Sequence, residues 1–210
     1  MDFFRFFQIM RIGLFGGTFD PVHYGHLALA REAIFRLSLD QLIWIPAIPW
    51  QKCDKKITPG HIRCNFIKAA IANEPRMSVD TIEIDAKTSS YSINTIKTLS
   101  LRYPNDQLFY LMGSDQWINF HTWKNWQEIL KSCTVAVFSR NSQLEQTSAQ
   151  VQKFVNDHLG CVELVNMPDV PISSSVVRDI IQKEGLDSKR LPKLIPLPVL
   201  NQLKSNKLAD

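Results

Sequence analysis

Continuous apolar runs alternate along this chain with amphipathic segments, and this alternation restricts the fold more than any other feature of the sequence. A strand with one face in water would instead alternate apolar and polar residues. Strands that are buried on both faces and separated by helices form a parallel sheet covered by helices on both sides. We therefore predict a doubly wound α/β domain with a small helical part at its C-terminus.

The expected elements follow from the period of the apolar residues. Strands are predicted at 9–15, 41–45, 77–84, 108–112, 134–138 and 162–165. Helices are predicted at 27–37, 61–72, 94–103, 126–130, 151–158, 174–183 and 198–204. Ligands of such sheets bind at the carboxyl ends of the strands, where the strand order reverses. The loops that should converge there follow Phe15, Ile45, Met112, Phe138 and Val165.

Length and charge narrow the class of protein. The 210 residues, 45% of them hydrophobic and 21% charged, suit one globular domain. We expect an N-terminal extension over 1–9 and a single domain over 10–210, with its C-terminal helical portion at about 172–210. The net charge of +4 is mild and scattered, which argues against a nucleic-acid partner. No run approaches the roughly 18 apolar residues of a membrane span.

The four cysteines lie at positions 53, 64, 133 and 161. Their spacing offers neither a zinc knuckle nor a redox pair. Reduced thiols in a chain of this size favour the cytoplasm.

The segment GGTFDPVHYGH, residues 16–26, directly follows the first predicted strand. Gly16 and Gly17 can adopt positive φ and admit a ligand close to the backbone. Pro21 suits the first turn of a helix that begins near 21–24. The free N–H groups of that turn would point to the same place as the glycines, which predicts a phosphate cradle.

Two histidines of this segment stand three residues apart. His23 and His26 would project from one face of the first helical turn. Gly25 between them leaves room for a ribose or a base. Asp20, before the proline, is read either as the helix N-cap or as a ribose or metal-water contact.

A second segment, ISSSVVR at 172–178, predicts another anion site. Ser173 or Ser174 can cap a helix, and Arg178 follows about one turn later on the side of the cap. Such a helix start suits β- and γ-phosphates. The alternative is a capped helix with a surface arginine.

GGTFDPVHYGH resembles the signature of the HxGH nucleotidyltransferases and, in this longer form, that of the bacterial nicotinate-mononucleotide adenylyltransferases. Similar segments follow in order: PWQK at 49–52, SYS at 90–92, GSD at 113–115, TW at 122–123 and ISSSVVR. The resemblance implies a Rossmann-like fold and a step of NAD biosynthesis. In that step the adenylyl group of ATP passes to nicotinate mononucleotide, giving nicotinate adenine dinucleotide and pyrophosphate, with Mg²⁺ brought by ATP and no dedicated metal site.

The resemblance also implies roles for individual residues. The implied catalytic residues are His23, His26, Lys52 and Arg178. ATP would bind at Gly16, Gly17, Phe19, His23, His26, Asp115, Ser173, Ser174 and Arg178. The mononucleotide would bind at Gly17, Thr18, Lys52, Ser90, Tyr91, Ser92, Trp123 and Lys124. Lys52 stands in Pro-Trp-Gln-Lys, where the family usually has Pro-Pro-His-Lys.

Three alternatives stay open at this stage. The acceptor could be mainly nicotinamide mononucleotide, or it could be another phosphorylated small molecule. The chain could also be a nucleotide-binding regulator without catalysis. The oligomeric state is not readable from the sequence.

Overall fold

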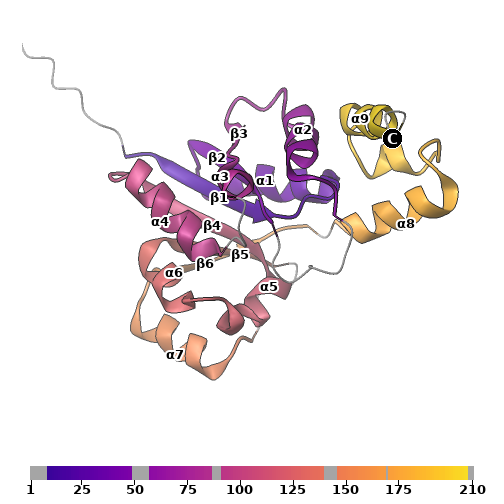
Figure 1. Cartoon of the computed structure of the whole chain (residues 1–210). Helices are drawn as coiled ribbons and strands as arrows, with labels where there is room; N and C mark the ends of the chain where they lie inside the picture. The colour runs from indigo at the N-terminus through magenta and orange to yellow at the C-terminus, as the bar shows by residue number, and fades with distance from the viewer. Residues whose placement is uncertain (1–8, 49–56, 87–90, 140–145, 169, 208–210) are drawn as a thin grey trace, which may run out of the picture.

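Six parallel strands form one sheet in the computed structural model of this chain (Figure 1). The structure describes residues 9–48, 57–86, 91–139, 146–168 and 170–207. The strands are β1 (Arg11–Gly17), β2 (Gln41–Pro46), β3 (Met77–Val79), β4 (Gln107–Gly113), β5 (Thr134–Ser139) and β6 (Val162–Asn166). Their order is β3-β2-β1-β4-β5-β6. The order therefore reverses between β1 and β4, which is the switch point where a ligand is expected.

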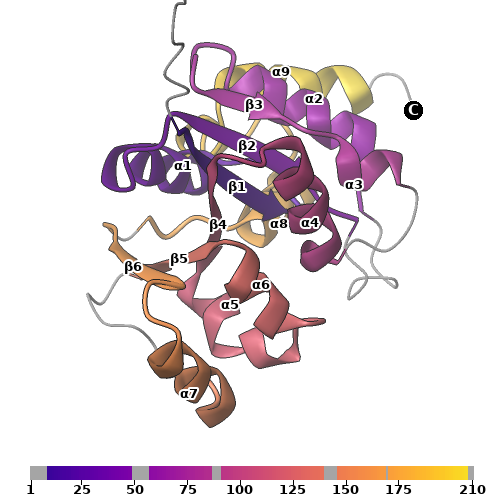
Figure 2. The same ribbon diagram turned by 90° about the vertical axis from the view of Figure 1, so that its left-hand side faces the viewer.

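Helices cover both faces of the sheet (Figures 1 and 2). One face carries α1 (Tyr24–Arg36), α2 (Gly60–Ala70) and α9 (Leu197–Lys207). The other carries α4 (Ser92–Arg102), α5 (Ser114–Ile118), the 3₁₀ turn η2 (Phe120–Thr122), α6 (Trp126–Ser132) and α7 (Ala149–Asp157). This arrangement confirms the predicted doubly wound α/β fold.

Adjacent residues of each strand enter different cores. In β1, Phe15 packs with Trp44 in the core under α1 and α2, whereas Leu14 packs with Ile43 in the core under α4 and α6. All four side chains are buried. A strand that is buried on both faces needs apolar residues at every position, which is why the strands could be read as uninterrupted runs.

The segment 77–84 departs from the prediction. Only Met77–Val79 forms the strand β3, and the chain then turns into the short helix α3 (Ile82–Asp85). The carboxylate of Asp80 accepts a hydrogen bond of 2.9 Å from the Ile82 N–H, which ends the strand and begins the turn. The other polar positions of this segment bond to other elements: Ser78 accepts from the Gln41 amide of β2, and Glu83 accepts from the Thr95 hydroxyl of α4. The helix α5 was also not predicted.

The C-terminal part has a small core of its own. Helix α8 (Ser174–Glu184), the 3₁₀ turn η3 (Leu191–Lys193) and α9 surround a cluster of buried apolar side chains: Val177, Ile180, Leu191, Ile195 and Leu200. Figures 1 and 2 show α8 beside the carboxyl end of β1. The C-terminal helices therefore reach the switch point.

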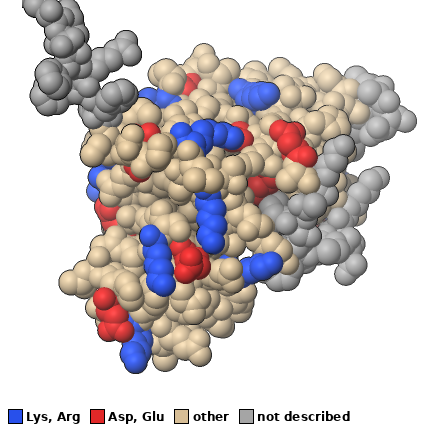
Figure 3. All heavy atoms as spheres, turned by 60° about the vertical axis from the view of Figure 1, so that its left-hand side comes forward, with Lys and Arg blue, Asp and Glu red and all other residues tan. Residues whose placement is uncertain are grey.

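Charged side chains of both signs are interspersed on the face shown in Figure 3. This distribution agrees with the scattered charge of the sequence. None of the helices that the structure describes is long and apolar enough to cross a membrane.

Candidate functional site

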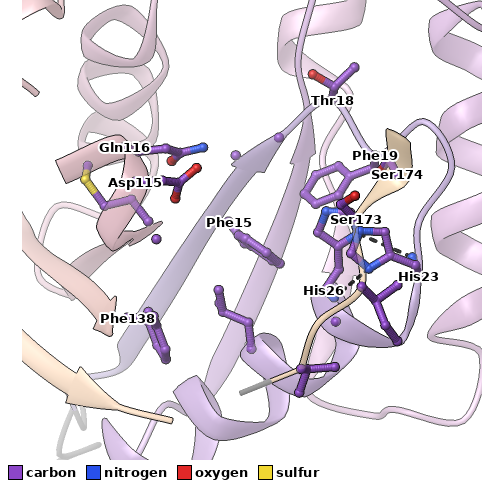
Figure 4. A pocket seen from close by; sticks show the side chains of 18 of the residues that line it. Phe15, Thr18, Phe19, His23, His26, Asp115, Gln116, Phe138, Ser173 and Ser174 are labelled. Atoms are coloured by element: carbon purple, nitrogen blue, oxygen red, sulfur yellow. Dashed lines mark hydrogen bonds between the residues drawn. The ribbon is translucent and has the colours of Figure 1, made fainter. Parts of the chain in front are cut away.

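A cleft of about 1050 Å³ opens at the carboxyl ends of β1 and β4. Its walls come from the loop after β1, the start of α5, the end of β5 and the start of α8 (Figure 4). Among its lining residues are all nine positions expected to bind ATP: Gly16, Gly17, Phe19, His23, His26, Asp115, Ser173, Ser174 and Arg178. The structure thus brings together residues that lie far apart in the sequence.

His23 and His26 lie against each other at the start of α1. Their rings are stacked, with centroids 3.7 Å apart. His23 is the N-cap residue, and its Nδ1 accepts from the His26 N–H at 3.3 Å. Nδ1 of His26 in turn accepts from the His23 N–H at 3.3 Å. Because both Nδ1 atoms accept, the neutral rings carry their protons on Nε2 and can donate from there.

Burial keeps both imidazoles neutral. It lowers the pKa of His23 to about 4. Burial also lowers the pKa of His26 well below its usual range, and the neighbouring His23 lowers it further. Near neutral pH the pair therefore offers hydrogen-bond donors without adding charge.

The depressed pKa of His23 predicts how stability depends on pH. Between about 4 and 6.5 the unfolded chain binds a proton at this histidine and the folded chain does not. The free energy of unfolding should therefore rise with pH across this window and level off above it, with a contribution from His23 of roughly 3–4 kcal/mol. Urea unfolding from pH 4 to 7 measures this slope. His23→Asn keeps an N-cap acceptor without a titrating ring and should reduce the slope, leaving the part that the lowered pKa of His26 contributes. Equal slopes in both proteins would contradict the assignment.

The turn before α1 differs from the prediction. The peptide bond between Asp20 and Pro21 is cis, and the helix begins only at Tyr24. Pro21 is therefore not in the first helical turn, and His23 takes the capping position that was considered for Asp20. The buried carboxylate of Asp20 instead accepts from the Thr58 N–H at 3.3 Å.

The glycines of the cradle also act in another way than expected. Neither Gly16 nor Gly17 has a positive φ. A Cβ on Gly16 would lie 2.7 Å from the hydroxyl of Tyr110. A Cβ on Gly17 would lie 2.8 Å from the ring of Phe19, whose φ of 49° folds its side chain back over the strand end. These glycines make room for the protein's own rings.

Gly25 serves a similar purpose. A Cβ there would lie 3.0 Å from the His23 ring and 3.3 Å from the carbonyl oxygen of Ile172. Gly25 lines the cleft, and its role in leaving space for a ribose or a base stays a prediction. Its lack of a side chain lets the His23 ring and the segment before α8 approach α1.

Replacing Gly16 by alanine should destabilise the fold through its contact with Tyr110. Overpacking of this kind typically costs about 1–3 kcal/mol. Tyr110→Phe removes the obstructing hydroxyl, so the double variant should be more stable than the sum of the two single changes predicts. Urea unfolding of the four proteins of this cycle gives the coupling energy. Strict additivity would show that Tyr110 does not set the requirement for glycine.

The start of α8 is bound to the loop after β1. Ser173 caps the helix by accepting from the Val176 N–H at 3.3 Å. The hydroxyl of Ser174 donates to the Pro21 carbonyl at 3.0 Å, and Nη1 of Arg178 donates to the Asp20 carbonyl at 2.6 Å. Both side chains also line the cleft. Arg178 therefore joins the two phosphate-binding segments that the sequence predicted separately.

Those of the predicted acceptor-binding residues that the structure describes divide into two groups. Gly17 and Thr18 line the cleft. The second group, Tyr91, Ser92, Trp123 and Lys124, lies outside this lining. Lys52 and Ser90 are outside the residues that the structure describes.

Tyr110 connects this second group to the cleft. Its hydroxyl lies 2.9 Å from Oγ of Ser92 and beside Gly16, and its ring centroid lies 5.9 Å from that of Trp123. The ammonium of Lys124 lies 4.3 Å from the ring centroid of Tyr91. Tyr91 and Trp123 pack on the core under α4 and α6, whereas Phe15 of the cleft packs on the opposite core. The second group therefore lies on the face of the sheet that carries α4 and α6, and Tyr110 links it to the end of β1 at Gly16.

Several lining residues were missed by the sequence reasoning. Five of them are apolar and one carries an amide: Leu29, Phe138, Met167, Val170, Ile172 and Gln116. Phe138 is the last residue of a predicted strand, and the loop after it was expected to converge at the ligand, but Phe138 itself was not predicted to bind. Nothing in the sequence marks Leu29, which projects from the middle of α1.

Among the described residues no cluster of three or more histidine, cysteine or carboxylate side chains could hold a metal ion. The described lining of the cleft contains two carboxylates, Asp20 and Asp115. Figure 4 shows Asp115 and Gln116 across the cleft from the histidine pair.

A parallel sheet with this strand order, and with amides, imidazoles and an arginine at its switch point, defines a protein of the nucleotide-binding α/β class. Residues 14–180 match the profile of the cytidylyltransferase-like family. A probable nicotinate-nucleotide adenylyltransferase of Carboxydothermus hydrogenoformans is 36% identical over 202 residues, covering 94% of this chain and 97% of the relative. One of Methylibium petroleiphilum is 34% identical over 190 residues, covering 90% of this chain and 87% of that protein.

The chain therefore belongs to the cytidylyltransferase-like family and, within it, to the nicotinate-nucleotide adenylyltransferases. The fold agrees with solved structures. The nicotinic acid mononucleotide adenylyltransferase of Plasmodium falciparum complexed with NaAD has a TM-score of 0.75 and 20% identity, with 95% of this chain and 97% of that chain covered.

Proposed function

We propose that this chain transfers the adenylyl group of ATP to nicotinate mononucleotide, giving nicotinate adenine dinucleotide and pyrophosphate in NAD biosynthesis. The observation that carries the proposal is the convergence of all nine expected ATP-binding residues on one cleft at the switch point. The names of the relatives point to the same reaction.

The chemistry requires alignment more than activation. A phosphate oxygen of the mononucleotide forms a bond to the α-phosphorus of ATP, and the bond from that phosphorus to the bridging oxygen of pyrophosphate breaks. The attacking oxygen is already an anion, so no general base is needed. The protein must hold two polyanions in line and stabilise the charge that develops.

The donors of the cleft suit this task. The Nε2–H groups of His23 and His26 would donate to the ATP phosphates, with His26 acting on the transition state. The capped start of α8 and Arg178 would hold the departing pyrophosphate. Gly17 and Thr18 would bind the acceptor phosphate, and Asp115 would accept from a ribose hydroxyl. Lys52 is proposed to reach a phosphate as well.

The second group of predicted acceptor-binding residues, which includes Trp123 and Lys124, would favour a charged pyridine ring. Trp123 offers a face for stacking, and Ser90, Tyr91 and Ser92 would border the ring. The ammonium of Lys124 beside Tyr91 would favour a carboxylate over a neutral amide. In this proposal Lys124 is the residue that distinguishes nicotinate from nicotinamide mononucleotide.

Mg²⁺ enters this proposal as part of the substrate. A triphosphate brings the ion on its own oxygens, and such sites need few protein ligands. The two single carboxylates of the cleft, Asp20 and Asp115, fit such a role better than that of a resident metal site. We also propose a cytoplasmic location, because the described cysteines, Cys64, Cys133 and Cys161, are free thiols.

The test is a turnover assay with purified protein, MgATP and either nicotinate or nicotinamide mononucleotide. We expect pyrophosphate and the dinucleotide in equal amounts, with the higher kcat/KM for the nicotinate form. Lys124→Met should reduce this preference. Faster turnover of the amide would establish nicotinamide mononucleotide as the acceptor. ATP binding without pyrophosphate release would establish a nucleotide-binding regulator.

A further inference from the structure

Arg63 is a buried cation that no part of the proposed site uses. It lies in the first turn of α2, and only 2% of its surface is exposed. Its Nε donates to the Thr58 carbonyl at 2.9 Å, Nη1 to the Thr18 carbonyl at 2.5 Å and Nη2 to the Ala47 carbonyl at 2.9 Å. These carbonyls belong to three segments: the loop after β1, the loop after β2 and the approach to α2. One guanidinium thus joins three segments beside the cleft.

The bond to Thr18 fixes the direction of a peptide plane. The bond between Thr18 and Phe19 is trans, so the carbonyl of Thr18 and the N–H of Phe19 point in opposite directions. Holding the carbonyl at Arg63 turns the N–H away from Arg63. Among the described residues nothing accepts a hydrogen bond from this N–H, and Phe19 lines the cleft (Figure 4).

Two further hydrogen bonds brace the same segments. The Ala47 N–H donates to the Gly17 carbonyl at 2.8 Å. The Asp20 carboxylate accepts from the Thr58 N–H at 3.3 Å. Burial lowers the pKa of the Arg63 guanidinium, and the negative charge of Asp20 opposes this effect. The buried cation therefore has a buried carboxylate near it as well as three carbonyl acceptors.

We propose that Arg63 is a positioning residue for adenylyl transfer: through the Thr18 carbonyl it holds the turn whose amide N–H groups receive the acceptor phosphate. Arg63 is not part of the cleft lining, so it acts through the backbone and not on a substrate. The inference rests on the proposed function, which puts that phosphate at Gly17 and Thr18. A lysine could not replace it, because an ammonium donates from one point and cannot reach three separated carbonyls.

The test is Arg63→Lys in the full chain, with two ligands that differ only in the phosphate. We expect kcat/KM for nicotinate mononucleotide to fall about 10- to 100-fold, mainly through KM. The inhibition constant of nicotinate riboside, which lacks the phosphate, should stay within about twofold of that of the wild type, since the hydrogen bonds of Arg63 go to Thr58, Thr18 and Ala47 and not to the residues proposed for the ring. Circular dichroism and a thermal midpoint above the assay temperature must show that the variant is folded. An equal loss for both ligands would overturn the inference.

Two further variants show whether the effect is specific to the guanidinium of Arg63. Arg76 donates to the Leu39 carbonyl at 3.3 Å, away from the cleft, so Arg76→Lys is the matched control and should keep wild-type kinetics. In Arg63→Ala, added guanidinium should restore part of the activity toward the mononucleotide, whereas tetramethylammonium at equal ionic strength should not. Equal rescue by guanidinium and by tetramethylammonium would also overturn the inference. An inactive wild type would instead reject the proposed function.

Discussion

Replacing His26 by alanine is expected to lower kcat about 100- to 1000-fold, because the change removes a donor that faces the charge of the transition state. The donor is well defined in the structure. Nδ1 of His26 is occupied by the His23 N–H, so the ring presents Nε2–H to the cleft. The ring packs edge to face on Phe19, with centroids 5.0 Å apart, which fixes its direction.

The loss of activity must be separated from the loss of a helix cap. His26→Ala also removes one half of the capping box, and the loss of a cap costs roughly 0.5–2 kcal/mol. His26→Gln offers an amide N–H near the position of Nε2. Its kcat should be at least about tenfold higher than that of His26→Ala, since one hydrogen bond to a charged group contributes about 1.5–3 kcal/mol. His158→Ala, on an exposed ring at the end of α7, is the control and should leave kcat unchanged.

The measurement is steady-state release of pyrophosphate at saturating MgATP and nicotinate mononucleotide. Unfolding curves of the same proteins show how much each variant is destabilised. A folded His26→Ala protein with wild-type kcat would exclude His26 from the chemistry. In that case the histidine pair would serve only to begin α1.

The fold could be predicted because the burial of each strand can be read from the types of its own residues. Both faces of strands such as β1 are buried, so Leu14 and Phe15 had to be apolar although they enter different cores. The prediction of one strand over 77–84 was wrong because the alternation of apolar and polar residues does not show where each polar side chain finds its hydrogen-bond partner. Glu83 is buried and accepts from the hydroxyl of Thr95 at 2.6 Å, a contact with another helix.

Most residues of the site could be predicted from the sequence, but their local geometry could not. The nine expected ATP-binding residues converge because parallel strands end at one edge of the sheet. The reason for the glycines was missed, since it depends on Tyr110, which a neighbouring strand brings against Gly16. Arg63 left no signal at all. A buried arginine in a helix can be recognised only when its three carbonyl partners are known.

Arg178→Ala is expected to lower kcat/KM for ATP about 100- to 1000-fold, the second large effect that the structure predicts. Its guanidinium is the one arginine side chain in the described lining of the cleft. Nη1 is held by the Asp20 carbonyl, which directs the rest of the planar group and leaves further N–H donors for the β- and γ-phosphates. Arg178→Lys should recover only part of the loss, because a lysine keeps the charge but not the planar fork.

Binding constants can separate phosphate recognition from the bond that ties α8 to the loop after β1. If Arg178 holds the departing pyrophosphate, the KM for ATP and the inhibition constant of pyrophosphate rise together, while the KM for nicotinate mononucleotide stays near its wild-type value. If the arginine only fastens α8, the turn around Asp20 loosens and the KM values of both substrates rise. Arg190→Ala is the matched control, since Arg190 lies in the same C-terminal part and pairs with the exposed Glu184 at the surface, where an ion pair contributes little to stability. Unchanged ATP kinetics in a folded Arg178→Ala protein would remove this residue from the phosphate site.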